Sequence, residues 1–178
     1  MKKQRKSKTA AVVTLRLWTY SGAQKVVPYL RSVVQSLRDG WLDLRQAQEQ
    51  LKRSEAYPGR PDRDTLIRLE ESRREIARVE ARVEETMHEM LVLSAYTLDP
   101  VAGLAVIPFV QGEGLAWFVF DLFDPQGLVA WRMHTDPLEM RRSLAELPVS
   151  QTTADSAAIP AVELRPEDNS RPSPGAQA

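Results

Sequence analysis

The sequence predicts an α+β protein in which a long antiparallel helical hairpin, coiled-coil-like, packs on a small antiparallel β-meander between disordered tails. Three observations predict this fold. Apolar residues recur at alternating spacings of three and four over residues 27–51, and a second apolar repeat of seven covers residues 69–90. Three short β-rich runs then follow within residues 103–133. A chain of 178 residues suits one domain plus tails.

The first helix is predicted to begin after Thr19 and to run through Pro28. If it began at Pro28, its N-cap would be Val27, among the poorest capping residues, whereas Thr19 is a good cap. The proline removes one backbone hydrogen bond, so we expect the helix to bend there. The seam positions that follow are Val27, Leu30, Val34, Leu37, Trp41, Leu44, Gln48 and Leu51. Only one of these is polar, which is typical of a coiled-coil seam.

The second helix is predicted to begin at Asp62 or Asp64 and to end at Asp99-Pro100, so that the hairpin occupies residues 19–98. The sequence YPGRPDRD at 57–64 separates the two helices, and so short a connection makes them antiparallel neighbours. The seven-residue repeat consists of Leu69, Ile76, Val83 and Met90. Each helix has ~30–35 residues, which makes the hairpin ~45–50 Å long.

A change of period marks the sheet. The runs GLAVIPFV, LAWFVFDLF and LVAWRM are joined by the turn sequences QGEG and DPQG, which predicts a three-stranded meander over 103–133. The apolar stretch 11–18 could add a fourth strand. A short helix is expected at 136–147, which completes one domain over 11–147. The basic arm at 1–10 and the Pro/Ser/Ala-rich tail at 148–178 are predicted to be disordered.

Composition excludes several classes of function. The chain has no cysteine, so it has no disulfide, thiolate metal site or cysteine nucleophile. Its formal net charge is zero and no apolar run is long enough to span a membrane, so we expect a cytoplasmic protein without a membrane partner. The strands at 103–131 contain no Lys or Arg, which leaves only weak nucleic-acid contact through the arm KKQRKSK at 2–8.

The order of elements resembles an uncharacterised bacterial family, domain of unknown function 2203. The matching residues over roughly 14–136 are Trp18, Thr19, Ala23 and Pro28 at the first helix, Gly103, Leu104 and Pro108 at the sheet, and the late Trp131. Two features depart from the family pattern. Phe123-Asp124-Pro125 stands where the family often has a Gly-Glu turn, and Arg132 stands where it often has a histidine. The resemblance implies no particular activity.

Candidate chemistry is sparse. His88-Glu89 would need a second histidine at position 92 for a zinc-protease helix, and Val92 is there. With two histidines and no cysteine we expect no zinc site and no cofactor. One set of residues near the end of the meander could bind a cation or a small molecule, with or without catalysis. It comprises Asp121, Asp124, His134 and Asp136.

The heptad seams favour a non-enzymatic interaction or scaffold protein. A hairpin of this length exceeds a small sheet, which spans ~20 Å along its strands. The distal half would therefore need cover, either from a second copy in a four-helix bundle or from another protein. The candidate interaction residues are Leu37, Trp41, Leu44, Leu51, Leu69 and Ile76.

Overall fold

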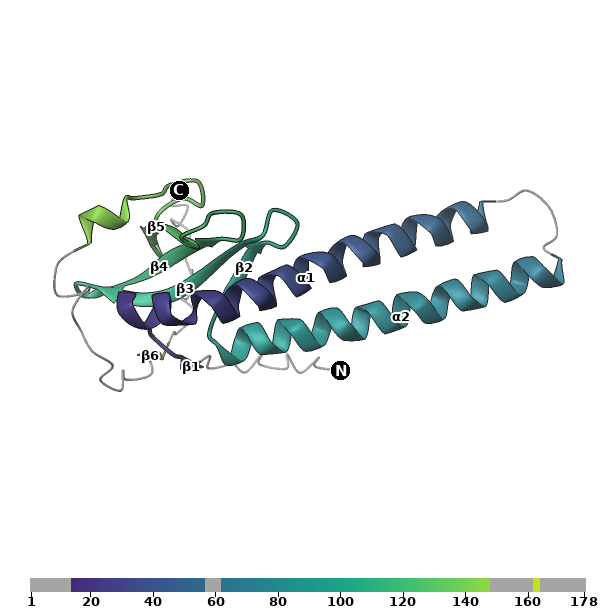
Figure 1. The fold of residues 1–178 in the computed structure, drawn as a ribbon, viewed down its shortest axis with the longest axis horizontal. Coiled ribbons are helices and arrows are strands. Elements are labelled where there is room, and N and C mark those ends of the chain that lie inside the picture. Colours follow the sequence, from purple (N-terminus) through teal and green to yellow (C-terminus); the bar gives the residue numbers. More distant parts are fainter. Residues whose placement is uncertain (1–13, 57–61, 148–161, 164–178) are drawn as a thin grey trace, which may run out of the picture.

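The computed structural model describes residues 14–56, 62–147 and 162–163 and confirms the α+β fold (Figure 1). Two long helices, α1 and α2, form an antiparallel hairpin, and four strands form an antiparallel sheet in the order β2-β3-β4-β5. The bounds are α1 Tyr20–Glu55, α2 Arg63–Val92, β2 Tyr96–Asp99, β3 Leu104–Gln111, β4 Gly114–Asp121 and β5 Leu128–Met133. A separate pair consists of β1 (Thr14–Leu15) and β6 (Val162–Glu163).

Helix α1 begins where the sequence predicts. Thr19 is its N-cap, with an extended backbone, and its hydroxyl accepts the amide N–H of Gly22 at 3.1 Å. The helix then continues through Pro28, which is exposed. Water can therefore reach the carbonyl group that lacks an N–H partner at the proline.

Replacing Thr19 with alanine should lower the free energy of unfolding by about 1 kcal/mol, because the Gly22 amide loses its acceptor at the start of the helix. Chemical denaturation would measure the change. Thr19→Ser is the matched control, since it keeps the hydroxyl, and it should restore most of the loss. Equal stability of the alanine variant and the natural protein would contradict the capping role.

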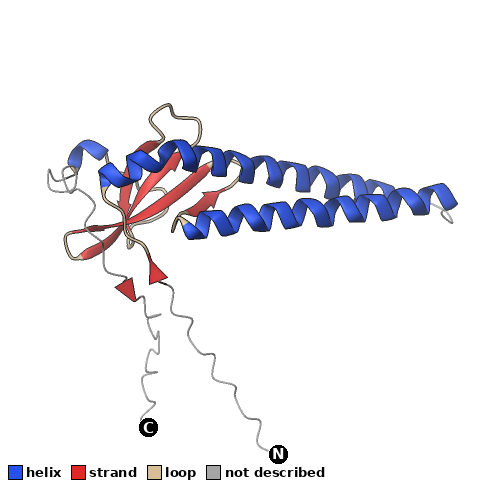
Figure 2. Cartoon of the chain, turned by 60° about the horizontal axis from the view of Figure 1, so that its bottom comes forward, coloured by secondary structure: helices blue, strands red, loops and turns tan. Residues whose placement is uncertain are grey.

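Helix α2 begins at the predicted cap Asp62, whose carboxylate accepts the amide N–H of Thr65 at 2.8 Å. Hydrogen bonds from Thr65 hold the pKa of the Asp62 carboxyl below its ordinary value. The two helices lie side by side along their length (Figures 1 and 2). Ion pairs Arg73–Glu55 and Arg82–Asp43 join them at 3.0 and 2.5 Å. Such exposed pairs add little stability, so apolar packing holds the hairpin together.

The prediction that the second helix extends to residue 98 is wrong. Helix α2 ends at Val92, and Ser94 takes a left-handed backbone conformation with φ of 51°. The amide of Ala95 then donates to the Met90 carbonyl, which closes the helix end. Residues 96–99 turn back to pair with β3, where Tyr96 lies opposite Val106. Residues 96–99 therefore form a strand along the edge of β3, where the prediction had a further turn of α2.

The fourth strand of the sheet is therefore β2, and not the stretch 11–18. Of that stretch, residues 11–13 lie outside the described residues, and β1 pairs with β6 rather than with the meander. Trp18 nevertheless joins the N-terminal stretch to the rest of the fold. Its amide donates to the Pro108 carbonyl at 2.9 Å, and its indole N–H donates to the Leu93 carbonyl at 3.0 Å.

The predicted helix at 136–147 is also wrong, because only Leu144–Glu146 forms a short 3-10 helix. Arg142 exchanges two backbone hydrogen bonds with Trp131 at 2.8 and 3.0 Å, which holds the chain extended along β5. Ser143 then caps the 3-10 turn. The predicted disordered arm at 1–10 lies outside the described residues, as does the tail at 148–178 apart from β6.

The core lies between α1 and one face of the sheet. Phe109, Phe118 and Phe120 are fully buried there, in one cluster with Leu30 and Val34 of α1. The rings of Phe109 and Phe118 stack with centroids 3.9 Å apart and planes 7° from parallel. The opposite face, which we call the outer face, carries a smaller buried cluster made of Val106, Val119 and Ala130. The sheet therefore buries apolar side chains on both faces.

Candidate functional site

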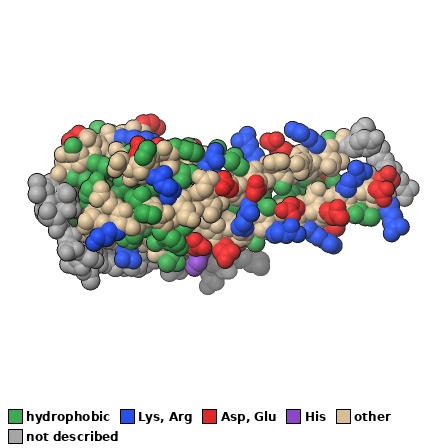
Figure 3. Space-filling model, in the orientation of Figure 1, with side chains coloured by type: hydrophobic (Ala, Val, Ile, Leu, Met, Phe, Trp, Pro, Cys, Tyr) green, Lys and Arg blue, Asp and Glu red, His purple; other side chains and the backbone are tan. Residues whose placement is uncertain are grey.

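The hairpin projects well beyond the sheet (Figures 1 and 2). The sequence predicted this difference, because helices of ~30–35 residues are longer than the strands of a small sheet. In the view of Figure 3, hydrophobic side chains gather over the sheet end, whereas charged side chains of both signs line the projecting part. Most of the predicted seam is used within the monomer. Leu37 and Leu44 are buried, and the half-buried seam residues are Leu51, Leu69 and Ile76. Trp41 alone of the six is exposed, at 36%.

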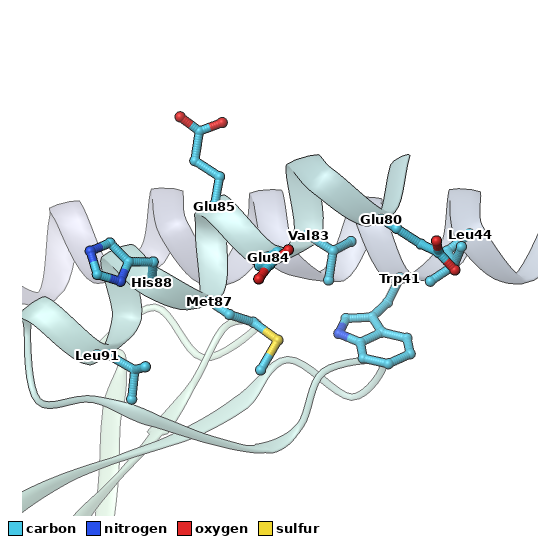
Figure 4. A pocket seen from close by; sticks show the side chains of 9 residues that line it. All are labelled: Trp41, Leu44, Glu80, Val83, Glu84, Glu85, Met87, His88 and Leu91. Carbon is cyan, nitrogen blue, oxygen red and sulfur yellow. The ribbon is translucent and has the colours of Figure 1, made fainter. Parts of the chain in front are cut away.

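An apolar groove lies on the hairpin next to Trp41 (Figure 4). Its volume is about 670 Å³, and its apolar lining consists of Trp41, Leu44, Val83, Met87 and Leu91. In Figure 4 the side chains of Trp41 and Met87 extend to the same side, whereas Glu85 extends away. Trp41 comes from α1 and Met87 from α2, so the groove depends on the pairing of both helices.

Negative charge surrounds this groove. Its polar lining residues are Glu80, Glu84, Glu85 and His88, and within the described residues none of them makes a salt bridge. The nearby Arg82 is already paired with Asp43. His88 is exposed. Two copies of this groove would therefore repel each other if they met face to face.

A second apolar surface lies near the start of α2, at the far end of the hairpin. We call it the tip patch, and it consists of Arg63, Leu66, Ile67, Glu70, Glu71 and Arg74 around a hollow of about 380 Å³. Leu66 is 53% exposed and Ile67 is 46% exposed. Both lie in the distal half that was expected to need cover, but neither is among the predicted interaction residues, because they lie off the seven-residue repeat. Two adjacent branched apolar residues off the seam of a charged helix were the available signal.

The structure does not bring the four predicted Asp and His residues together. Asp121 and Asp124 lie at the β4–β5 turn, where their carboxylates accept the amides of Phe123 at 2.9 Å and Gln126 at 2.7 Å. The other two lie past the opposite end of β5, and Asp136 there accepts the amide of Met133 at 2.8 Å. Over the described ranges, no three His, Asp or Glu side chains gather in a way that could hold a metal ion.

His134 belongs instead to a cavity of about 320 Å³ on the outer face of the sheet. Its lining residues are Tyr96, Leu98, Val106, Trp117, Arg132, His134 and Leu138. The indole N–H of Trp117 donates to Nδ1 of His134 at 3.1 Å, and Tyr96 meets Trp117 edge to face at 5.7 Å. Burial raises the pKa of Tyr96. We refer to this site as the outer-face cavity.

Arg132 is the unusual member of the cavity. It is only 6% exposed, yet no carboxylate in the described part of the chain forms a salt bridge with it. One terminal nitrogen donates to the backbone carbonyl of Asp136, while Nε is buried without an acceptor. In the sequence, Arg132 stands out only as a departure from a family pattern. Its burial follows from pairing opposite Trp117, which a single strand sequence does not reveal.

Together these features define an α+β protein with a projecting helical hairpin, two apolar surfaces on that hairpin and one cavity on the sheet. Residues 16–136 match the model of a family described as "Uncharacterized conserved protein (DUF2203)", and the chain belongs to this family, which confirms the resemblance. Neither the curated proteins nor the solved structures contain a match. No helix in the described ranges is long and apolar enough to cross a membrane.

Proposed function

We propose that this protein is a non-enzymatic interaction or scaffold module that self-associates as a homodimer through its helical hairpin. The observation that carries the proposal is the tip patch, where Leu66 and Ile67 are each about half exposed on a part of the hairpin that the sheet does not reach. A second copy would remove these side chains from water, which stabilises association.

The charges of the tip patch suit a second copy in antiparallel orientation. If α2 crosses its symmetry mate at a point midway between Leu66 and Ile67, each of these residues lies opposite the other in the partner. The same register places Arg63 opposite Glu70, and the two-fold axis repeats that pair. The apolar contacts and the charges therefore support the same register. The acidic groove beside Trp41 cannot pair with its own copy in this way.

Replacing Ile67 with aspartate should weaken self-association at least tenfold, about 1.4 kcal/mol, because it places a charge in the apolar centre of the contact. Sedimentation over a range of concentrations of the full chain would measure it. The matched control is Leu91→Asp, which changes a residue of the same helix that is 55% exposed within the acidic groove, against 46% for Ile67. A chain that stays monomeric at high micromolar concentration, or a larger effect from Leu91→Asp, would contradict the proposal.

Charge exchange tests the register itself. Arg63→Glu should weaken association because Glu then faces Glu70 at two symmetric positions. Combining Arg63→Glu with Glu70→Arg should restore association, since each pair again has opposite charges. A double variant as weak as the single one would reject this register while leaving the tip patch as the contact.

A further inference from the structure

The outer-face cavity contains a buried positive charge without a counter-ion. Burying a guanidinium is costly unless it is paired and hydrogen-bonded, and buried arginines are usually paired for this reason. Arg132 is 94% buried, since 6% of its surface is exposed, and its Nε has no acceptor among the described residues. The carboxylate nearest in sequence, Asp136, is already held by Arg142 at 3.1 Å and by the Met133 amide.

Apart from His134, the remaining walls of the cavity are apolar or aromatic. Leu98, Val106 and Leu138 supply aliphatic surface, and Tyr96 and Trp117 supply two ring surfaces at nearly a right angle. Leu138 is 63% exposed at the rim, so the cavity opens toward solvent there. Such a lining, with one positive group among apolar walls, is typical of a small-molecule site.

We propose that the outer-face cavity binds a small monocarboxylate with an apolar, ring-containing body. The carboxylate accepts hydrogen bonds from Arg132, whose planar group suits two carboxylate oxygens. The body of the ligand lies between the aliphatic and aromatic walls. This function is separate from self-association, because the cavity is on the sheet and the tip patch is at the far end of the hairpin.

The residues present favour a monocarboxylate over phosphate. Arg132 is the one Lys or Arg side chain that lines the cavity among the described residues, so a doubly charged anion would be only half neutralised. The apolar walls would also strip water from phosphate oxygens without replacing their hydrogen bonds. The apolar body of a monocarboxylate makes no hydrogen bonds with water, so it loses none when it enters the cavity.

His134 supplies a second polar contact at the rim. Its Nδ1 accepts the Trp117 indole N–H, so the neutral ring carries its proton on Nε2 and has a donor there. The hydrogen bond also fixes the ring beside Trp117. We therefore assign His134 a secondary ligand contact and expect a smaller contribution from it than from Arg132.

The test uses the full chain labelled with ¹⁵N and titrated with sodium phenylacetate. We expect saturable binding that shifts the Arg132 Nε–H and Trp117 indole N–H resonances together. Benzyl alcohol, which lacks the charge, and inorganic phosphate, which lacks the apolar body, should bind at least tenfold more weakly. No saturable shift at millimolar phenylacetate, or equal binding of either comparison compound, would overturn the proposal.

Variants separate the ligand contact from the stability of the fold. Arg132→Met keeps the length and apolar stem of the side chain and should abolish saturable binding. Leu138→Asp changes an exposed rim residue and should weaken phenylacetate binding at least tenfold by charge repulsion. Met140→Asp is its matched control, since Met140 is 47% exposed in the same loop but does not line the cavity. Equal binding by Leu138→Asp and Met140→Asp, or unchanged binding by a folded Arg132→Met, would reject the site.

Discussion

Replacing Phe118 with alanine is expected to lower the free energy of unfolding by about 3–5 kcal/mol, a large part of the stability of a domain of this size. Phe118 has no exposed surface and stacks on Phe109 at 3.9 Å. It also lies against Tyr20 of α1, with ring centroids 5.8 Å apart. Removing the ring therefore leaves a cavity between helix and sheet, and it removes an aromatic pair as well.

Chemical denaturation followed by circular dichroism measures this loss. The matched control is Phe123→Ala, which removes the same ring where it is 63% exposed in the β4–β5 turn. That ring contacts only the Arg38 guanidinium at 5.2 Å among the aromatic and cation contacts of the described residues, so its loss should cost about 0.5 kcal/mol. If Phe118→Ala cost no more than Phe123→Ala, the packing of α1 on the sheet would not be the main source of stability.

Elements with local signals could be predicted from the sequence. Thr19 and Asp62 both accept a backbone amide as capping residues, and this needs only the neighbouring three residues. The turn at Asp124 is likewise local, since its carboxylate accepts the Gln126 amide and its carbonyl accepts the Gly127 amide. Because these hydrogen bonds form within short segments, the sequence of each segment is sufficient to predict them.

Elements that depend on a distant partner could not be predicted in this way. The residues of β2 follow a helical repeat directly, and their strand forms because the edge of β3 offers Val106 and its neighbours as partners. The stretch after β5 has helix-forming residues, yet Arg142 bonds to Trp131 instead. In both cases a backbone pairing with another part of the chain outweighs local propensity.

The candidate site shows the same limit. Asp124 and His134 are ten positions apart, and the six residues of β5 lie between them. A strand of that length spans about 20 Å, so it carries the two groups to opposite ends of the sheet. The position of Arg132 beside Trp117, in contrast, is fixed by the β4–β5 register. Residues that are close in sequence are thus separated by the sheet, whereas the cavity residues come from all four strands β2 to β5 and from the loop after β5.

The second large effect is expected at Gly40, which is buried on α1 against Val83 of α2. A Cβ atom at this position would lie 2.8 Å from Cγ2 of Val83, a stiff β-branched side chain. Gly40→Leu should therefore force the helices apart and lower the free energy of unfolding by about 3 kcal/mol. Gly40→Ala should cost about 1 kcal/mol, because its gain of about 1 kcal/mol in helix propensity offsets part of the overpacking.

The control for Gly40→Leu is Ser36→Leu, one turn earlier on α1 at an exposed position, where the same side chain should change stability by about 0.5 kcal/mol or less. Combining Gly40→Ala with Val83→Ala tests the contact directly, because the smaller residue at 83 makes room for the new methyl group. The two changes should then cost less together than the sum of each alone. Additive costs would mean that the two positions do not touch. The close pairing of α1 and α2 that forms the groove beside Trp41 would then not exist at Gly40 and Val83.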